Sequence, residues 1–313
     1  MKRILLHAGA QKTGSTSLQR WFYSHETLLN GLGMTCPRRL IKRGDVDPIH
    51  RILTSARPGC DRSKLKKAFL KRLEELSGET GQQTVLLSHE TIFGLPFEER
   101  GDGFYPDFMA RLSNFQYLIE GTGIEVDVVF FIRDYCDFIS SSYVQYVKMG
   151  GTYSLSRFVS SYDAQALGPA VQGAVLRGNP IAWEPITQAL QQAFPGRVRI
   201  VDFTQFFATP SENLSRIFFD GAVSLEDCRG LESIRVNSSP PMVAVHLARH
   251  ANIVLKYLTK LPKRKIGHVS SAAFIGPAER FHRFRLKGLA LNKALVSFKE
   301  RYRQDLQSLV WKG

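Results

Sequence analysis

The positions of apolar residues follow two alternating patterns along the first two thirds of the chain. Continuous apolar runs, rich in leucine, β-branched and aromatic residues, predict buried strands at residues 4–6, 84–88, 126–132 and 198–201. Between these runs, apolar residues recur every three or four positions and predict helices over residues 63–76, 105–121, 136–148, 179–194 and 211–219. Strands that alternate with helices are typical of an α/β fold, in which helices cover both faces of a parallel sheet.

Two parts of the chain depart from this alternation. Residues 31–62 carry Gly, Pro and Arg without a clear period, and they predict a loop-rich insertion that extends, with the following helix, to about residue 80. Ser63 is the expected N-cap of that helix. From Pro241 onward good strand patterns are lacking, so the part from about 220 to 313 is predicted to be helical. Because no repeat or long linker divides the sequence, we expect one domain over residues 1–313.

The loop after the first predicted strand has a composition that favours binding of an anion. Residues 9–17 read Gly-Ala-Gln-Lys-Thr-Gly-Ser-Thr-Ser, and apolar residues at helical spacing begin directly afterwards, at residue 18. A strand, a tight turn and a helix start bring free backbone N–H groups and the positive end of the helix dipole to one point. Several hydroxyl groups and Lys12 add further donors. We interpret this stretch as a phosphate-binding loop, and an ordinary strand-to-helix turn is the alternative.

The order of residues in this loop distinguishes it from two common nucleotide-binding loops. Lys12 precedes Gly14, so the pattern Gly-x4-Gly-Lys-Ser/Thr is not met, and a Gly-x-Gly-x-x-Gly fingerprint is lacking there. The stretch His7-x-Gly-x-x-Lys-Thr-Gly-Ser-Thr-Ser-Leu-Gln resembles the 5′-phosphosulfate-binding loop of sulfotransferases that use 3′-phosphoadenosine 5′-phosphosulfate (PAPS). Bacterial members related to the carbohydrate sulfotransferases are especially similar. The resemblance implies a P-loop-like α/β fold.

A second stretch, at the end of the third predicted strand, combines an arginine with a serine. Arg133 leaves the buried strand and Ser141 follows eight positions later in a predicted helix, which Asp134 and Asp137 are placed to cap. A guanidinium and a hydroxyl can hold one phosphate from two sides. This pair resembles the 3′-phosphate-binding motif of the same family. A surface arginine and an incidental serine are the alternative.

The resemblance assigns the donor-binding residues and the chemistry. It implies that PAPS is the sulfuryl donor, that adenosine 3′,5′-bisphosphate is the product, and that no metal takes part. The residues that would bind PAPS are Gln11, Lys12, Thr13, Gly14, Ser15, Thr16, Ser17, Arg133 and Ser141. Lys12 would also stabilise the negative charge that grows on the leaving phosphate.

A general base for the acceptor is expected at the end of the second predicted strand, where Glu90 is preferred and His89 is the rival. Side chains alternate along a strand, so only one of the two is expected to face the site. A buried, hydrogen-bonded His89 and a turn-capping Glu90 are the structural alternative.

The charge and the cysteine content indicate which kinds of partner and which compartment to expect. The 42 Lys and Arg residues outnumber the 28 Asp and Glu residues, for a formal charge of +14, which favours an anionic partner such as a nucleotide, an acidic glycan, nucleic acid or a membrane surface. A nucleic-acid-binding signature is lacking, so nucleic acid is not an expected partner. The resemblance implies that the acceptor is a carbohydrate or another small hydroxyl compound, acidic ones included. Four scattered cysteines, the lack of a transmembrane-length apolar run and a motif close to Met1 favour a cytoplasmic protein, with peripheral membrane contact left open.

Two other functions compete with sulfuryl transfer. A P-loop kinase or nucleotide hydrolase is disfavoured by the displaced lysine and by the lack of magnesium ligands at the expected positions. A non-enzymatic polyanion-binding protein would account for the excess positive charge, and it predicts binding that weakens steeply with salt.

Overall fold

The chain is described by a computed structural model over residues 3–10, 14–39, 46–81, 83–96, 104–160, 182–231, 240–280 and 306–311. It divides into two compact units. The first unit comprises Met1–Arg133, Ala182–Val236 and Asp305–Gly313, and the second comprises Asp134–Ile181 and Asn237–Gln304. Compactness does not show whether either unit folds alone, so the expectation of one domain stays a prediction.

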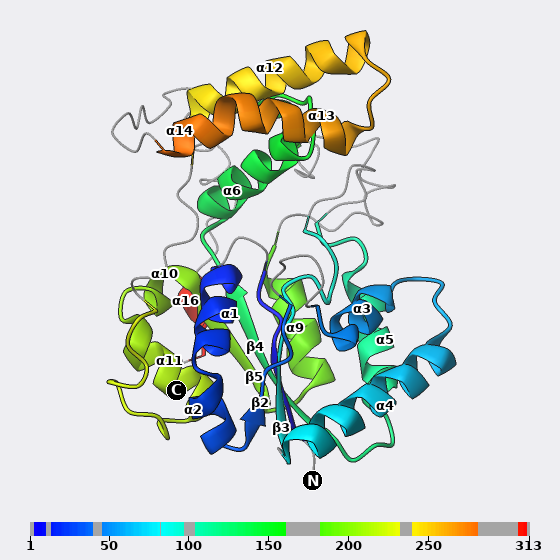
Figure 1. Ribbon diagram of the computed structural model, residues 1–313, viewed down its shortest axis with the longest axis vertical. Coiled ribbons are helices and arrows are strands. Elements are labelled where there is room, and N and C mark those ends of the chain that lie inside the picture. Colours follow the sequence, from blue (N-terminus) through cyan, green and yellow to red (C-terminus); the bar gives the residue numbers. More distant parts are fainter. Residues whose placement is uncertain are drawn as a thin grey trace. The chain divides into compact units, whose positions relative to one another are not determined.

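The first unit is built on a parallel sheet of five strands in the order β2-β3-β1-β4-β5 (Figure 1). The strands are β1 (Arg3–His7), β2 (Met34–Thr35), β3 (Thr84–Ser88), β4 (Glu125–Ile132) and β5 (Val198–Asp202). All four strand pairs are parallel, and His7 at the end of β1 lies opposite Ser88 on one side and Val129 on the other. This confirms the predicted α/β fold with a parallel sheet.

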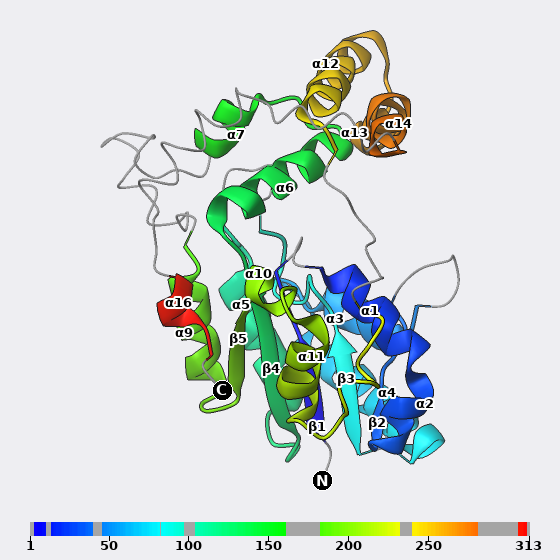
Figure 2. The ribbon, with the colours of Figure 1, turned by 90° about the vertical axis from the view of Figure 1, so that its left-hand side faces the viewer.

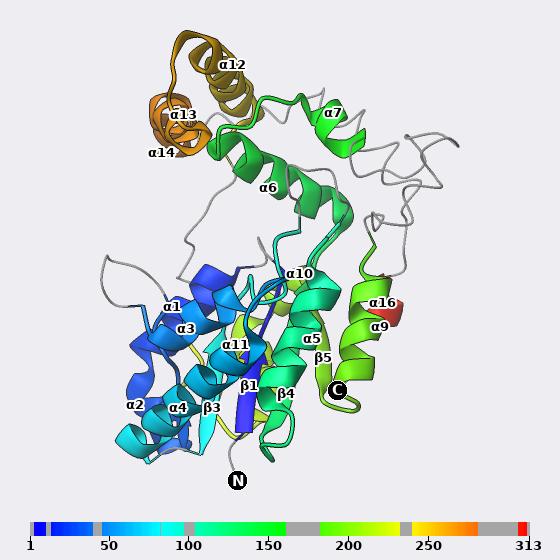
Figure 3. The ribbon, with the colours of Figure 1, turned by 90° about the vertical axis from the view of Figure 1, so that its right-hand side faces the viewer.

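Helices cover both faces of this sheet (Figures 2 and 3). The helices on one face are α1 (Ser15–Ser24), α2 (Glu26–Gly31), α10 (Phe203–Phe206) and α11 (Pro210–Phe219). Their apolar residues pack in one cluster with Leu5, Val129 and Phe131 of the sheet. The helices on the other face are α3 (Pro48–Ser55), α4 (Arg62–Thr80), α5 (Phe108–Ile119) and α9 (Glu184–Ala193). The short α16 (Leu306–Leu309) also belongs to this unit.

The described part of the second unit is helical, as predicted for the chain after Pro241. It contains α6 (Tyr135–Lys148), α7 (Leu155–Ser160), α12 (Met242–Leu258), α13 (Lys263–Ser270), the π-helical segment η1 (Ser271–Ile275) and α14 (Gly276–Arg280). The buried amide of Asn252 on α12 donates to the carbonyl oxygens of Val147 (2.9 Å) and Gly151 (3.0 Å) and accepts a hydrogen bond from Ser270 Oγ. One side chain therefore ties α12 to α13 and to the end of α6.

The structure corrects two expectations. Residues 31–62 are not a plain loop, because they contain the edge strand β2 and helix α3. β2 has only two residues, too few to show a period, whereas Asp47 followed by Pro48 was a readable start signal for α3. The N-cap of α4 is Asp61 rather than Ser63, because the Asp61 carboxylate accepts the Lys64 N–H at 3.0 Å.

Replacing Asn252 tests the polar tie of the second unit. We expect Asn252→Ala to lower the free energy of unfolding by about 1–3 kcal/mol, because two buried carbonyl groups and a hydroxyl lose their partner. Urea unfolding followed by circular dichroism measures this. The matched control is Asn30→Ala at an exposed position of α2, and equal midpoints for both variants would contradict the prediction.

Candidate functional site

The ends of β1, β3 and β4 form the point where the strand order reverses. β1 lies between β3 and β4; the chain that leaves β1 goes to the β2–β3 side, and the chain that leaves β3 crosses to β4 on the other side. Ligands of open parallel sheets bind outside the carboxyl ends of the strands at such a switch point. We therefore place the candidate site at the loop that follows β1.

The beginning of this loop is held on the neighbouring strand. Ala8 N–H donates to Val129 O at 3.0 Å and Ala10 N–H donates to Phe131 O at 3.2 Å, so the chain follows β4 past the end of β1. Both alanines and the glycine between them are buried. Gln11, Lys12 and Thr13 lie outside the described residues, and their expected contacts with PAPS stay predictions.

Helix α1 begins directly after Gly14, and its first residue carries a buried hydroxyl that lacks a partner among the described residues. Gly14 is left-handed, with φ 73°, and a Cβ there would lie 2.7 Å from Phe207 Cε2, so glycine alone fits. No side chain caps this helix start in the part of the chain that the structure describes. Ser15 is only 3% exposed, and its Oγ has no hydrogen-bond partner there. Thr16 and Ser17 follow in the same turn, half-buried. These groups fit an anionic ligand.

Arg133 is linked to this helix start through Phe203. The Arg133 guanidinium carbon lies 4.7 Å from the centre of the Phe203 ring. Phe203 begins α10 directly after β5, and its ring lies 3.0 Å from the position that a Cβ on Gly14 would take. The end of β4 and the start of α1 therefore meet on one aromatic ring. The structure thus brings together three of the predicted residues, Gly14, Ser15 and Arg133.

The other half of the second motif lies in a different unit. Ser141 is half-buried on α6, in the second unit, whereas Arg133 is the last residue of the first segment of the first unit. The predicted pairing of Ser141 with Arg133 stays a prediction. The expected helix start is confirmed, because the Asp134 carboxylate accepts hydrogen bonds from the N–H groups of Cys136 (3.0 Å) and Asp137 (3.2 Å).

The two candidate bases lie in different surroundings. His89 is fully buried, with its Nε2 3.2 Å from Thr54 Oγ1 and its ring stacked on His50 at 5.4 Å between centroids. Burial, and to a lesser degree the positive charge of Arg39, holds the pKa of His89 well below 6.5. The Glu90 side chain is 27% exposed and its Oε1 lies 3.8 Å from Arg39. Glu90 is therefore the candidate that a solvent-borne acceptor can reach, and which residue is the base stays a prediction.

Sequence reasoning missed Arg39. Its guanidinium lies beside Glu90 and donates to Thr91 Oγ1 at 2.9 Å, and its backbone N–H donates to Tyr23 Oη at 2.7 Å. Burial lowers the pKa of Arg39, and the negative charge of Glu90 opposes this shift. Arg39 lies in the stretch expected to be a loop, where the pair Arg38–Arg39 was the available signal.

Below this edge His7 connects β1 to β3. Its Nδ1 lies 2.8 Å from Ser88 Oγ, and the ring packs edge-on against Phe131 and Phe218. Full burial, and to a lesser degree Arg39, lowers the pKa of His7 to about 3. The imidazole is therefore neutral at neutral pH. Gln19 of α1 donates to Ser88 O at 3.2 Å, which attaches the helix to the same strand end.

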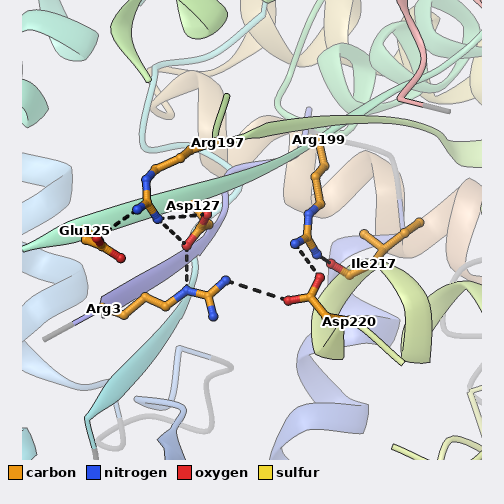
Figure 4. A network of polar contacts seen from close by, with 7 residues as sticks. All are labelled: Arg3, Glu125, Asp127, Arg197, Arg199, Ile217 and Asp220. Atoms are coloured by element: carbon orange, nitrogen blue, oxygen red, sulfur yellow. Dashed lines mark hydrogen bonds and ion pairs between the residues drawn. The ribbon is translucent and has the colours of Figure 1, made fainter. Parts of the chain in front are cut away.

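A separate pocket of about 800 Å³ lies at the opposite edge of the sheet, lined by Arg62, Tyr117, Glu125, Arg197 and their neighbours. Ion pairs surround the strand starts at this edge (Figure 4). Asp127 accepts hydrogen bonds from Arg3 Nε at 2.6 Å and from Arg197, and Arg199 pairs with Asp220. The pocket lies a strand length away from the loop after β1, so we assign these pairs to stability and keep the site at the other edge.

Comparisons with known proteins add little to this geometry. No protein-family model matches the chain, and no curated protein matches its sequence. A solved structure that is similar is the crystal structure of a sulfotransferase from Alicyclobacillus acidocaldarius, at 13% identity and a TM-score of 0.45, covering 82% of this chain and 96% of that chain. A likeness of this degree carries no argument about function.

Two further observations concern the described residues. No group of three or more His, Cys, Asp and Glu side chains among them is arranged to hold a metal ion. No helix in the described ranges is both long enough and apolar enough to span a membrane.

The buried histidines predict a pH-dependent stability. Burial lowers the pKa of His7 to about 3 and of His50 to about 4, whereas the unfolded chain binds these protons near pH 6.5. The unfolded state therefore binds more protons below pH 6.5. The free energy of unfolding should fall as the pH drops from 6.5 to 5, by about 1.4 kcal/mol per pH unit for each fully titrating histidine.

Urea titrations between pH 5 and 7.5 measure this slope. His7→Gln should reduce it, because one neutral buried imidazole is removed. His268→Gln, at an exposed position of α13, is the control and should leave the slope unchanged. The same slope in both variants would contradict the predicted role of His7.

Proposed function

We propose that this protein is a PAPS-dependent sulfotransferase that transfers the sulfuryl group to a hydroxyl or amine of a carbohydrate or glycolipid. The observation that carries the proposal is the meeting of the α1 start and Arg133 on Phe203 at the switch point of the sheet. Gly14 and Ser15 belong to the motif at residues 7–19 and Arg133 belongs to the motif at residues 131–143, the two stretches that resemble the family. None of the four cysteines forms a disulfide, which supports a reducing compartment such as the cytoplasm.

The residues at this edge fit the donor. PAPS, when bound, supplies the sulfuryl group and leaves as a bisphosphate. The uncapped N–H groups of α1 and the unpartnered Ser15 hydroxyl are suited to its 5′-phosphate, with Gln11, Thr13, Thr16 and Ser17 completing the loop. Arg133 is suited to the 3′-phosphate, because its guanidinium is already oriented by Phe203. Ser141 completes this second phosphate site in the proposal.

Two charged residues would carry the chemistry. The Lys12 ammonium stabilises the negative charge that develops on the leaving phosphate. Glu90 accepts the proton of the acceptor hydroxyl, and Arg39, 3.8 Å away, restrains the carboxylate. His89, enclosed by Thr54 and His50, is better placed to support the strand end than to meet the acceptor.

Nucleotide binding tests the proposal. In calorimetric titrations, adenosine 3′,5′-bisphosphate should bind without added magnesium and more tightly than ATP. We expect Arg133→Ala to weaken bisphosphate binding roughly 10- to 100-fold and to change adenosine 5′-monophosphate binding little, because the monophosphate lacks the 3′-phosphate. The matched control is Arg62→Ala, since Arg62 also stacks on a ring, Tyr117 at 4.6 Å, but at the opposite edge of the sheet.

Three outcomes would contradict the proposed nucleotide specificity or the role given to Arg133. A preference for ATP with magnesium would favour the kinase or hydrolase instead. A similar loss for both nucleotides in Arg133→Ala would show that Arg133 acts through the fold. Binding of any polyanion with steep salt dependence and no preference for the bisphosphate would favour the non-enzymatic protein.

Turnover tests the catalytic assignments. Release of adenosine 3′,5′-bisphosphate from PAPS, measured with a panel of mono- and oligosaccharides, should be abolished by Lys12→Ala. Glu90→Gln should lower kcat by about 10²- to 10⁴-fold with little change in bisphosphate affinity, because general-base catalysis contributes a factor of this size. Glu26→Gln is the matched control, because Glu26 is paired with Arg38 at 3.2 Å on an exposed surface. If His89→Gln has the larger effect on kcat, the base is His89.

A further inference from the structure

The turn between α12 and α13 exposes large apolar side chains. We call residues 256–265, which include the end of α12 and the start of α13, the hairpin tip. Tyr257 is 83% exposed and Leu258 is 76% exposed, and Leu261 is exposed as well. The two helices run side by side and are joined by this turn (Figures 1 and 2). Apolar side chains that gather at one exposed place indicate an interaction surface.

The same ten residues are strongly cationic. Lys256, Lys260, Arg264 and Lys265 are all exposed, and none of them takes part in an ion pair within the described part of the chain. The sequence from 240 to 278 contains no Asp and no Glu. The positive charge of the tip is therefore not neutralised by carboxylates of its own segment. A partner with negative charge would complement it.

The hairpin tip is presented by a well-packed support. Asn252 ties α12 to α6 and α13, and a Cβ on Gly267 would lie 2.2 Å from Gly150 N, so α13 lies in close contact with the end of α6. The Lys263 ammonium, at the inner side of the tip, lies 5.1 Å from the centre of the Tyr146 ring. The exposure of Tyr257 and Leu258 is thus a property of a folded hairpin.

We propose that the hairpin tip docks on the surface of a membrane that contains anionic lipid. A lipid leaflet offers an anionic headgroup layer above an apolar layer, and the tip carries cations and apolar side chains within ten residues. Leu258 and Leu261 enter the acyl boundary, the Tyr257 ring lies at headgroup level, and the long Lys and Arg side chains reach the phosphates.

Other partners match only one of the two properties. A second copy of the tip would bring like charges together, and nucleic acid would offer phosphates but no apolar layer for Leu258. The membrane is therefore the partner for which both the charge and the exposed apolar area are used. This inference is independent of the proposed enzymatic function, because it rests on the second unit alone.

Co-sedimentation of the full chain with vesicles tests the docking. Binding to vesicles of phosphatidylcholine with phosphatidylglycerol should exceed binding to phosphatidylcholine alone. We expect Lys256→Glu with Lys260→Glu, and separately Tyr257→Ser with Leu258→Ser, each to weaken binding at least about tenfold. The charge control is Lys67→Glu with Lys71→Glu on the exposed side of α4, and the apolar control is Met109→Ser with Leu225→Ser, both exposed in the first unit.

Several results of the co-sedimentation experiment would overturn the proposed membrane docking. Equal losses in the tip and control variants, or equal binding to the two kinds of vesicle, would overturn the proposal. So would a tip that responds to charge reversal but not to loss of Tyr257 and Leu258, since that pattern is general electrostatic attraction. Self-association that the tip variants abolish, or tighter binding to a DNA duplex than to the vesicles, would assign the tip to another partner.

A fluorescence measurement tests the insertion of the tip into the lipid layer separately from the overall binding affinity. Leu258→Trp should show emission shifted to shorter wavelength when anionic vesicles are added, because the indole leaves water. The chain's own tryptophans are Trp21 and Trp183, which are fully buried, and Trp311, which is half-buried. Their emission is measured on the unsubstituted chain with the same vesicles and subtracted. Leu225→Trp, in the first unit, should show no shift, and an unshifted Leu258→Trp would overturn the insertion of the tip.

Discussion

The candidate site depends on the hydrogen bonds that continue β1 along β4. His7 ends β1 opposite Val129, but β4 runs on to Ile132, and Ala8 and Ala10 keep pairing with it. This parallel pairing brings the loop and the end of β4 to the same edge, where Arg133 and the start of α1 meet on Phe203. Gly14 makes the meeting possible, because any larger residue would collide with Phe207.

Several polar side chains near this edge are buried without a full set of hydrogen bonds, which lowers the stability of the fold. His7, His50 and His89 are enclosed as neutral imidazoles, and each has one ring nitrogen with no partner among the described residues. The Ser15 hydroxyl is unpartnered in the same sense. Unsatisfied buried groups are destabilising and gather at functional sites, where a ligand can supply the missing partner. Their concentration around the β1 and β3 ends agrees with the position of the proposed donor site.

The second unit follows a different physical principle. It has no sheet in its described part and relies on close helix contacts at glycines and on the polar tie of Asn252. This packing uses one side of α12 and leaves apolar and cationic side chains of the hairpin tip facing water. In the first unit, by contrast, helices cover both faces of the sheet, so its apolar residues form a core. The exposed apolar residues of the hairpin tip instead form an interaction surface.

Local patterns in the sequence determined the sheet, most of its helices and the two motifs. β3 has the predicted bounds and β4 begins one residue earlier than predicted, because long runs of β-branched and aromatic residues are favourable only as buried strands. Only the tertiary structure decided the rest. The two residues of β2 form a strand because they pair with β3. Phe203, at the end of β5, contacts Arg133 and lies next to Gly14. Arg39 lies beside Glu90, although 51 positions separate them in the chain. Contacts between residues so far apart leave no period in the sequence, so neither the aromatic support of the site nor its extra arginine could be read from it.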